Sequence, residues 1–184
     1  EIGVYAEILP GDARLDAAAL AGVKGVILSG SPRSVYEPGA PIVDPRFYGA
    51  GLPVLGICYG LHRLATDHGG RVAGLGHKEY GRARVDVLED DPLFARMPRR
   101  SFVSWMSHGD TVADVPPGFR VIARSEGGLP AAFADPARRL WGVQFHPETS
   151  HCEGGREVLE AFVADVAGAR REWNMDAFLR AERA

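Results

Sequence analysis

The chain has 184 residues, of which 46% are apolar, and a formal net charge of −3. This size suits one globular domain with a full core, and the scattered basic residues form no patch for nucleic acid. The longest apolar runs have the length of a strand, and no basic signal-peptide region opens the sequence. Two cysteines, Cys58 and Cys152, are too few for a disulfide framework and fit a reducing cytosol. We therefore expect a cytoplasmic protein without nucleic-acid or membrane partners.

Short apolar runs alternate with helical patterns in the first half of the chain, which predicts α/β layering around an open, mostly parallel sheet flanked by helices. The expected elements, in chain order, are a strand at Val4–Leu9, a short helix at Leu15–Leu20, a buried strand at Val23–Ser29, a helical turn at Pro45–Gly51, a buried strand at Leu52–Ile57 and a helix at Tyr59–His68. The breaker-rich segment Gly30–Arg33 is expected to be a loop, and Gly69 and Gly70 end the last helix.

The second half of the chain changes to short strands joined by polar turns, which predicts hairpins and an antiparallel extension that makes the sheet mixed. These strands are expected at Gly81–Leu88, Phe102–Met106, Phe119–Arg124, Ala131–Ala134 and Leu140–Phe145. From Gly155 the pattern becomes helical again, with one apolar face. That face comprises Val158, Leu159, Phe162, Val163 and Val166. No repeat or low-complexity linker divides the chain, so we expect one domain.

Cys58 stands between a predicted strand and a predicted helix in Gly56-Ile57-Cys58-Tyr59-Gly60, the layout of a nucleophile elbow. Such an elbow pushes its central side chain out of a sharp turn at the carboxyl edge of a sheet, and the flanking glycines avoid clashes. The N-terminus of the following helix offers free N–H groups and a positive dipole end that stabilise an anion. A free cysteine is most often a small buried hydrophobic residue. The elbow spacing favours a nucleophile instead.

A nucleophilic thiolate needs a base, and the base needs an acceptor that orients it. His146 follows the predicted strand Leu140–Phe145, at the carboxyl edge where open α/β sheets place their sites. Glu148 lies two residues further on, where it can accept a hydrogen bond from the imidazole. Read alone, this segment is a strand-ending turn with a solvated carboxylate. Together with the elbow it predicts a Cys58–His146–Glu148 triad. No metal-ligand spacing occurs among the histidines and cysteines, so no metal is expected.

Two stretches, Pro53–Gly60 and Gly142–Glu148, together resemble the class I (triad) glutamine amidotransferases. Other stretches resemble those members of the family that supply ammonia for the amination of xanthosine monophosphate (XMP) to GMP. These stretches are Gly3–Ile8, Ile27–Gly30, Trp105–Asp110 and Trp173–Phe178. The resemblance covers essentially the whole chain and implies a flavodoxin-like fold, whose first strand we expect to be missing. It implies an amidotransferase domain at residues 1–170 and the start of a linker at 171–184.

The resemblance also implies a reaction, in which Cys58 attacks the side-chain amide of L-glutamine while His146 moves protons and Glu148 orients it. Backbone N–H groups of Tyr59 and of the Gly30–Ser31 loop would form the oxyanion hole. The pocket for the amino-acid end of glutamine would be lined by Ser107, Gly109 and Asp110. No cofactor is implied in this domain. A separate ATP-pyrophosphatase domain, in the same chain or in another subunit, would use ATP and Mg²⁺ to activate XMP.

Two positions depart from the family pattern. His62 stands where the family has a glutamine that helps to hold the substrate, and Ser31 stands where it has a second glycine beside the oxyanion. If that loop needs a positive φ, a serine there costs about 1 kcal/mol or more. These departures leave open a degenerate domain that binds a partner without catalysis. A third possibility is another triad amidohydrolase or the amidotransferase subunit of another biosynthetic enzyme.

Overall fold

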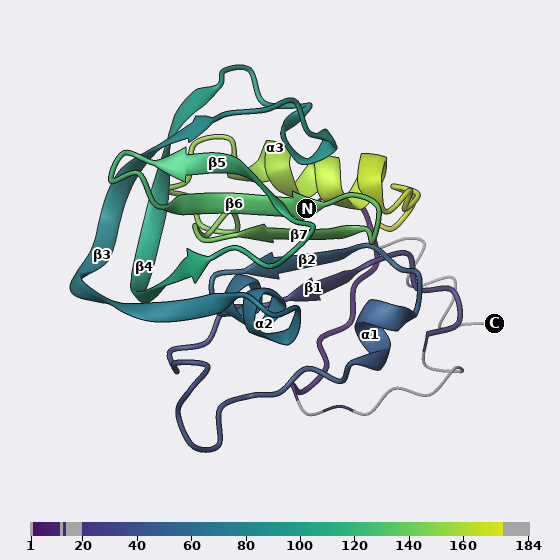
Figure 1. The fold of residues 1–184 in the computed structure, drawn as a ribbon. Coiled ribbons are helices and arrows are strands. Elements are labelled where there is room, and N and C mark those ends of the chain that lie inside the picture. Colours follow the sequence, from purple (N-terminus) through teal and green to yellow (C-terminus); the bar gives the residue numbers. More distant parts are fainter. Residues whose placement is uncertain (1, 12, 14–19, 175–184) are drawn as a thin grey trace.

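The structure, a computed structural model, describes residues 2–11, 13 and 20–174, without the side chains of residues 75–78. One seven-stranded sheet, in the order β1-β2-β7-β6-β5-β3-β4, organises this part of the chain (Figure 1). The strands are β1 (Val26–Leu28), β2 (Val54–Ile57), β3 (Arg71–Val87), β4 (Ser101–Asp114), β5 (Arg120–Ser125), β6 (Pro130–Asp135) and β7 (Leu140–Val143). The helical elements are α1 (Arg46–Gly49), α2 (Tyr59–Asp67), the 3-10 turn η1 (Pro92–Phe94), α3 (Gly155–Glu160) and the π-helical turn η2 (Ala161–Val166).

The sheet is mixed, as expected, with its parallel part formed by β1, β2 and β7. The other four pairings between described strands are antiparallel, so the parallel share is smaller than the expected "mostly parallel" sheet. The antiparallel share is larger because the second half of the chain consists of strands joined by short turns, and short turns can join only antiparallel neighbours. The parallel pairing of β2 with β7 nevertheless brings their carboxyl ends side by side, at the edge where Cys58 and His146 were predicted.

Each face of the central strands carries its own hydrophobic core. Successive side chains of a strand point to opposite faces, and accordingly Leu55 and Trp141 pack with α3 and η2 while Val54 and Leu140 pack with α2. Figure 1 shows α2 and α3 apart, with the central strands between them. Helices on both faces hold β2 and β7 firmly, so the loops that leave their carboxyl ends start from fixed points.

Several elements confirm the sequence predictions. The helical turn α1, the fully buried strand β2, the helix α2 with its glycine stop, and strands β5 and β6 all lie where expected. The helical face predicted after Gly155 is also present, since Val158 and Phe162 are buried in the core. Its second half is a π-helical turn, in which the Ala167 N–H donates to the Phe162 carbonyl at 2.8 Å.

Three predictions need correction. No strand lies among described residues 2–11, where Val4–Leu9 was expected, and Ile8 is fully exposed because no neighbouring strand offers this segment a ladder. β1 covers only Val26–Leu28 of the predicted strand, and as an edge strand it leaves Ile27 44% exposed. β7 ends at Val143, two residues early, where its carbonyl accepts the Cys58 N–H. Most of the helix expected at Leu15–Leu20 lies outside the described residues.

The β3–β4 hairpin is much longer than predicted and extends the antiparallel half of the sheet. It pairs Arg71 with Asp114 at one end and Asp86 with Ser101 at the other, with a register shift between Gly74 and Glu79. The prediction covered only the regularly alternating stretches, because glycines and charged residues hide the strand pattern at the shift. This irregular part of the hairpin reaches the site described below, through Glu79 and His108.

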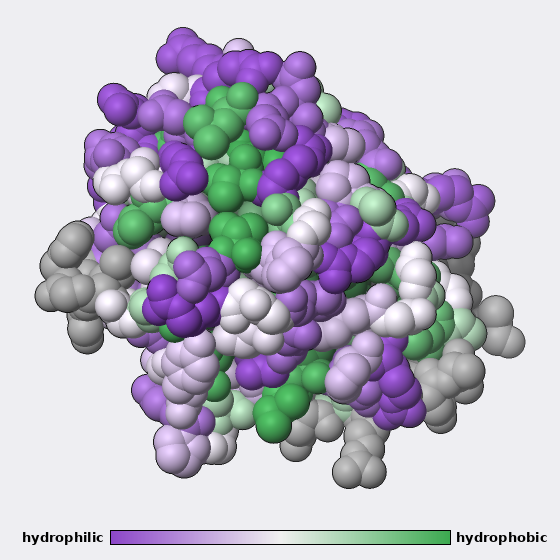
Figure 2. All heavy atoms as spheres, in the orientation of Figure 1, coloured by the Kyte–Doolittle hydropathy of each residue, from purple (hydrophilic) through white to green (hydrophobic). Residues whose placement is uncertain are grey.

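None of the helices in the described part of the chain combines the length and the apolar character that crossing a bilayer requires. On the face shown in Figure 2, hydrophobic residues form a narrow band among hydrophilic ones.

Candidate active site

Cys58 occupies a sharp corner between β2 and α2. Its backbone is left-handed, with φ of 51° and ψ of −103°, a strained conformation for a residue with a side chain. A Cβ at Gly56 would lie 2.5 Å from the Gly60 carbonyl carbon, and one at Gly60 would collide with the Leu28 carbonyl. Both flanking glycines are therefore required for β1, β2 and α2 to approach one another. The predicted nucleophile elbow is confirmed as backbone geometry.

His146 lies beyond the end of β7, held by its N–H donating to the Trp105 carbonyl at 3.1 Å. Its Nδ1 is 2.7 Å from a carboxylate oxygen of Glu148. Hydrogen bonding with Cys58 and then with Glu148 raises the pKa of His146 to about 10, against the lowering effect of burial. The buried Nε2 makes no hydrogen bond of regular geometry among the described residues. Cys58 nevertheless lies near enough to the ring to be the largest influence on its pKa.

Glu148 completes the predicted triad. Partial burial raises the pKa of its carboxyl, but the hydrogen bond from His146 and a backbone N–H outweigh burial, so the net pKa lies below its usual value. The carboxylate is therefore ionised at neutral pH and faces a ring that holds a proton. A thiol, an imidazolium and a carboxylate in this order can act as a nucleophile, a proton carrier and an orienting acceptor, and these roles stay a prediction.

The predicted oxyanion elements surround Cys58. A Cβ at Gly30 would lie 3.3 Å from Cε1 of His146 and 3.8 Å from Cβ of Cys58, so the loop backbone passes directly over the pair. Among described non-glycine residues only Cys58 and Arg139 have a positive φ, so Ser31 occupies its loop without the strain considered above. Tyr59 begins α2, where a helix leaves its first N–H groups without internal partners. Their role as oxyanion donors stays a prediction.

The residues predicted to line the substrate pocket lie on β4. Ser107 is nearest to the nucleophile, since its carbonyl oxygen is 3.9 Å from Sγ of Cys58. Asp110 lies near enough to His62 for its charge to act on the pKa of that ring. For Gly109, the structure gives a place in the strand between the two and no contact with the site. Their contact with glutamine stays a prediction.

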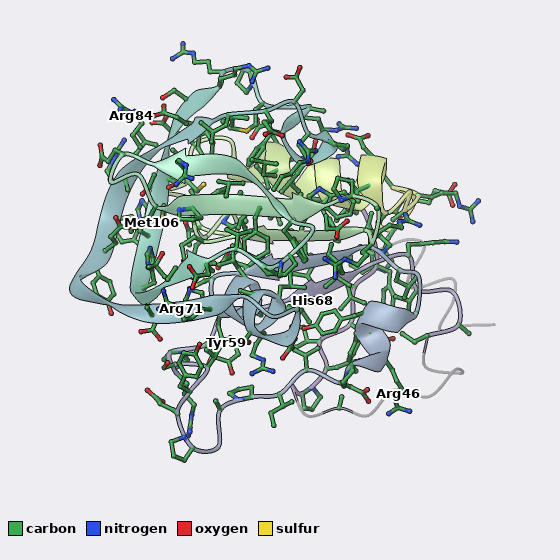
Figure 3. The ribbon with its side chains drawn as sticks, in the orientation of Figure 1. Arg46, Tyr59, His68, Arg71, Arg84 and Met106 are labelled. Atoms are coloured by element: carbon green, nitrogen blue, oxygen red, sulfur yellow. The ribbon has the colours of Figure 1, made fainter. Side chains whose placement is uncertain are left out.

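His62, expected to hold the substrate, turns instead toward a residue that no sequence motif singled out. Its Nε2 lies 2.8 Å from Oε1 of Gln144, and Nε2 of Gln144 lies 3.8 Å from Sγ of Cys58. The sequence held a signal for Gln144, because it continues the alternation of Leu140 and Gly142 on the α2 face of the sheet. Figure 3 labels Tyr59 and His68, which mark the two ends of the helix that carries His62.

His108 is a second buried group that was not predicted from the sequence. Its Nδ1 lies 2.8 Å from the Asp110 carbonyl and its Nε2 lies 3.1 Å from Oε2 of Glu79. Burial lowers the pKa of His108. The available signal was the alternation of buried residues at even positions from Phe102 onward along β4. Within the described residues, no three His, Cys, Asp or Glu side chains gather where they could hold a metal ion.

Comparison with known proteins agrees with this geometry. The family model described as "Glutamine amidotransferase class-I" matches residues 1–166. The chain is 43% identical over 97% of its length to a GMP synthase [glutamine-hydrolyzing] of Limosilactobacillus reuteri, and 49% identical over 95% to that of a Parafrankia species. It spans 35% and 33% of those two relatives. A crystal structure from Thermoplasma acidophilum, described as a candidate GMP synthase subunit, superposes with a TM-score of 0.70 at 26% identity, covering 97% of this chain and 84% of that one.

Proposed function

The chain belongs to the class I glutamine amidotransferase family, and from this premise we propose that it hydrolyses L-glutamine through a Cys58 thioester and supplies ammonia for the amination of XMP to GMP. The observation that carries the proposal is the placement of Cys58, His146 and Glu148 together at one edge of the sheet, with Nδ1 of His146 2.7 Å from Oε1 of Glu148 and both His146 and Cys58 beside the backbone of Gly30. The similarity to GMP synthases over nearly the whole chain supports the choice of final product.

The geometry supports a simple course for the reaction. The Cys58 thiolate attacks the amide carbon of glutamine, and protonated His146 gives its proton to the nitrogen as the C–N bond breaks, releasing ammonia. His146, now neutral, takes a proton from water, whose oxygen attacks the thioester. Glutamate leaves, and the thiolate and imidazolium are restored. Glu148 holds the ring in place throughout and stabilises its charged form.

The remaining parts of the proposal concern partners. The chain spans about a third of the curated relatives that it matches, which supports a synthetase partner of the ATP-pyrophosphatase type, in the same chain or as a separate subunit. That partner would bind ATP, Mg²⁺ and XMP, whereas residues 1–170 would work without a cofactor and residues 171–184 would lead toward it. Arg171 and Trp173 hydrogen-bond to the carbonyls of Ile2 and Gly3, so the described start of this segment contacts the domain. The two free thiols, Cys58 and Cys152, support a cytoplasmic location.

The test is release of ammonia and glutamate from glutamine by the intact protein. Cys58→Ala is expected to lower this activity by about 10³-fold or more, since it removes the nucleophile. Cys152→Ala is the matched control, because burial raises the pKa of this second thiol to about 11 and keeps it unreactive. With the synthetase partner, ATP, Mg²⁺ and XMP present, Cys58→Ala should still support GMP formation from added ammonium salt but not from glutamine. Undiminished ammonia release by Cys58→Ala would contradict the proposal.

A further inference from the structure

A line of buried polar groups joins α2 to the thiol. His62 and Gln144 are 3% and 2% exposed, so neither side chain finds its hydrogen bonds in water. The 2.8 Å contact between them is followed by the 3.8 Å contact from the Gln144 amide nitrogen to Sγ of Cys58. His146 of the predicted triad also interacts with this sulfur. Cys58 thus has polar neighbours besides His146, namely the Ser107 carbonyl at 3.9 Å and the Gln144 amide, and of these only the amide can donate a hydrogen bond to the sulfur.

The chemistry of a thiolate fixes the direction of every hydrogen bond in this line. A thiolate only accepts, so the Gln144 amide must present its NH₂ group to the sulfur and its oxygen to His62. Oε1 also only accepts, so Nε2 of His62 must carry a proton and donate it. Burial lowers the pKa of His62, so the ring is neutral at pH 7 with this proton on Nε2. A single arrangement of protons therefore satisfies all three groups.

We propose that His62 is a positioning residue that acts on the nucleophile through Gln144. By donating to Oε1 it keeps the amide N–H directed at Sγ, where the N–H stabilises the thiolate. The inference rests on the proposed function in taking Cys58 as the nucleophile. It gives position 62 a task distinct from holding the substrate, because the one nitrogen with an observed partner is engaged inside the protein.

The placement of His62 on α2 explains how this residue can act on the nucleophile through Gln144. The His62 N–H donates to the Cys58 carbonyl at 3.1 Å, so residue 62 begins the turn directly after the elbow. Helical side chains lean toward the N-terminus, which brings the His62 ring back over the nucleophile end of α2. The other titratable groups near this line are His108 and Asp110 on β4 and His146 beyond β7. The variants below leave all three unchanged.

The test measures the reactivity of Cys58 without substrate, as the rate of alkylation by iodoacetamide against pH, followed by mass spectrometry on the intact protein. His62→Leu should alkylate about tenfold more slowly, since one N–H···S bond to the thiolate is lost. His62→Gln, whose amide nitrogen can replace Nε2 as donor, should retain most of the rate. His68→Leu, the same change at the far end of α2, is the matched control and should leave the profile unmoved.

A double-mutant comparison tests whether His62 acts through Gln144. Gln144→Leu should slow alkylation to a similar degree, and adding His62→Leu to it should have no further effect. Additive losses would overturn the proposal. An unaltered alkylation profile with a raised KM for glutamine in His62→Leu would also overturn it, by placing His62 on the substrate. Failure of the proposed function shows differently, as a Cys58→Ala protein that still hydrolyses glutamine.

A measurement on the unmutated protein keeps the inference testable even if the leucine variants do not fold. In the ¹⁵N spectrum of the histidine rings, the signal of His62, assigned by its disappearance in His62→Gln, should be that of a neutral ring protonated on Nε2 at pH 7. A proton on Nδ1 of His62 would mean that Nε2 accepts rather than donates, which would reverse the Gln144 amide and contradict the proposal.

Discussion

At the scale of single residues, the hydrogen bonds to His146 set the pH range of the proposed reaction. Both partners favour the charged ring, so its pKa is raised to about 10 and the ring stays protonated as pH rises from 7 to 9. Above about pH 10 the ring loses the proton that the leaving nitrogen needs. We therefore expect kcat/KM for glutamine hydrolysis to fall as pH rises through 10. Glu148→Gln removes a supporting charge, which should move this fall to lower pH and lower the neutral rate by about 10²–10⁴-fold.

The pH–rate profile of glutamine hydrolysis checks this prediction. Glu172→Gln is a matched control, since Glu172 is largely exposed and pairs with Arg170 away from the site. An alkaline limb that stays in place in Glu148→Gln would show that the carboxylate does not support the imidazolium.

Individual residues of the site also differ in how far the sequence could predict them. The triad followed from local patterns, because an elbow needs glycines on both sides and a strand end places His146 at the same edge. The strand alternation placed Gln144 on the α2 face of the sheet, but its role could not be predicted, because a buried amide is recognised only by its partner. That partner, His62, lies 82 positions away on another element.

At the scale of elements, the contact between α2 and β1 depends on one missing side chain. Gly60→Ala should lower the free energy of unfolding by about 3 kcal/mol or more, because the added Cβ meets the rigid Leu28 carbonyl rather than a flexible side chain. Urea denaturation measures the loss. Gly49→Ala is the control, since nothing lies within 4 Å of the new Cβ at the end of α1. It should raise stability by about 0.5–1 kcal/mol. Equal stabilities for the two variants would contradict the packing argument.

Helices and strands could be predicted where the local sequence pattern determines them. They could not be predicted where their formation depends on a neighbouring strand. β2 is apolar and buried on both faces, so its run of residues predicted it well. Val4–Leu9 has a similarly apolar pattern, but a strand exists only with a partner to share its hydrogen bonds. The length of the β3–β4 hairpin was missed for the opposite reason, because pairing continues through residues whose pattern does not suggest a strand.

At the scale of the whole molecule, Asp91 links strands β7 and β5 and the turn η1 through hydrogen bonds of its side chain. Its buried carboxylate accepts hydrogen bonds from the Trp141 indole on β7, at 2.9 Å, and from Arg120 on β5, at 2.8 Å, while capping η1 through Leu93. Asp91→Ala should lower the free energy of unfolding by about 3 kcal/mol or more, because it leaves buried donors without an acceptor. Thermal or urea unfolding provides the measurement.

The Arg71–Asp114 ion pair is the matched control for this prediction, since both of its side chains are more than half exposed. Asp114→Ala should cost less than about 1 kcal/mol, as exposed pairs usually do. A comparable loss in both variants would mean that Asp91 contributes as a charge alone and not as a buried junction. No local pattern predicts such a junction, because it joins residues from three elements that only the folded chain brings together.

The positive φ at Cys58 presents the thiol at the corner between β2 and α2 but lowers the stability of the fold. Holding a side chain at such an angle costs on the order of 1–3 kcal/mol, and a glycine in the same corner would avoid most of that cost. Replacing Cys58 by glycine should therefore stabilise the fold while removing the sulfur from the carboxyl edge of the sheet.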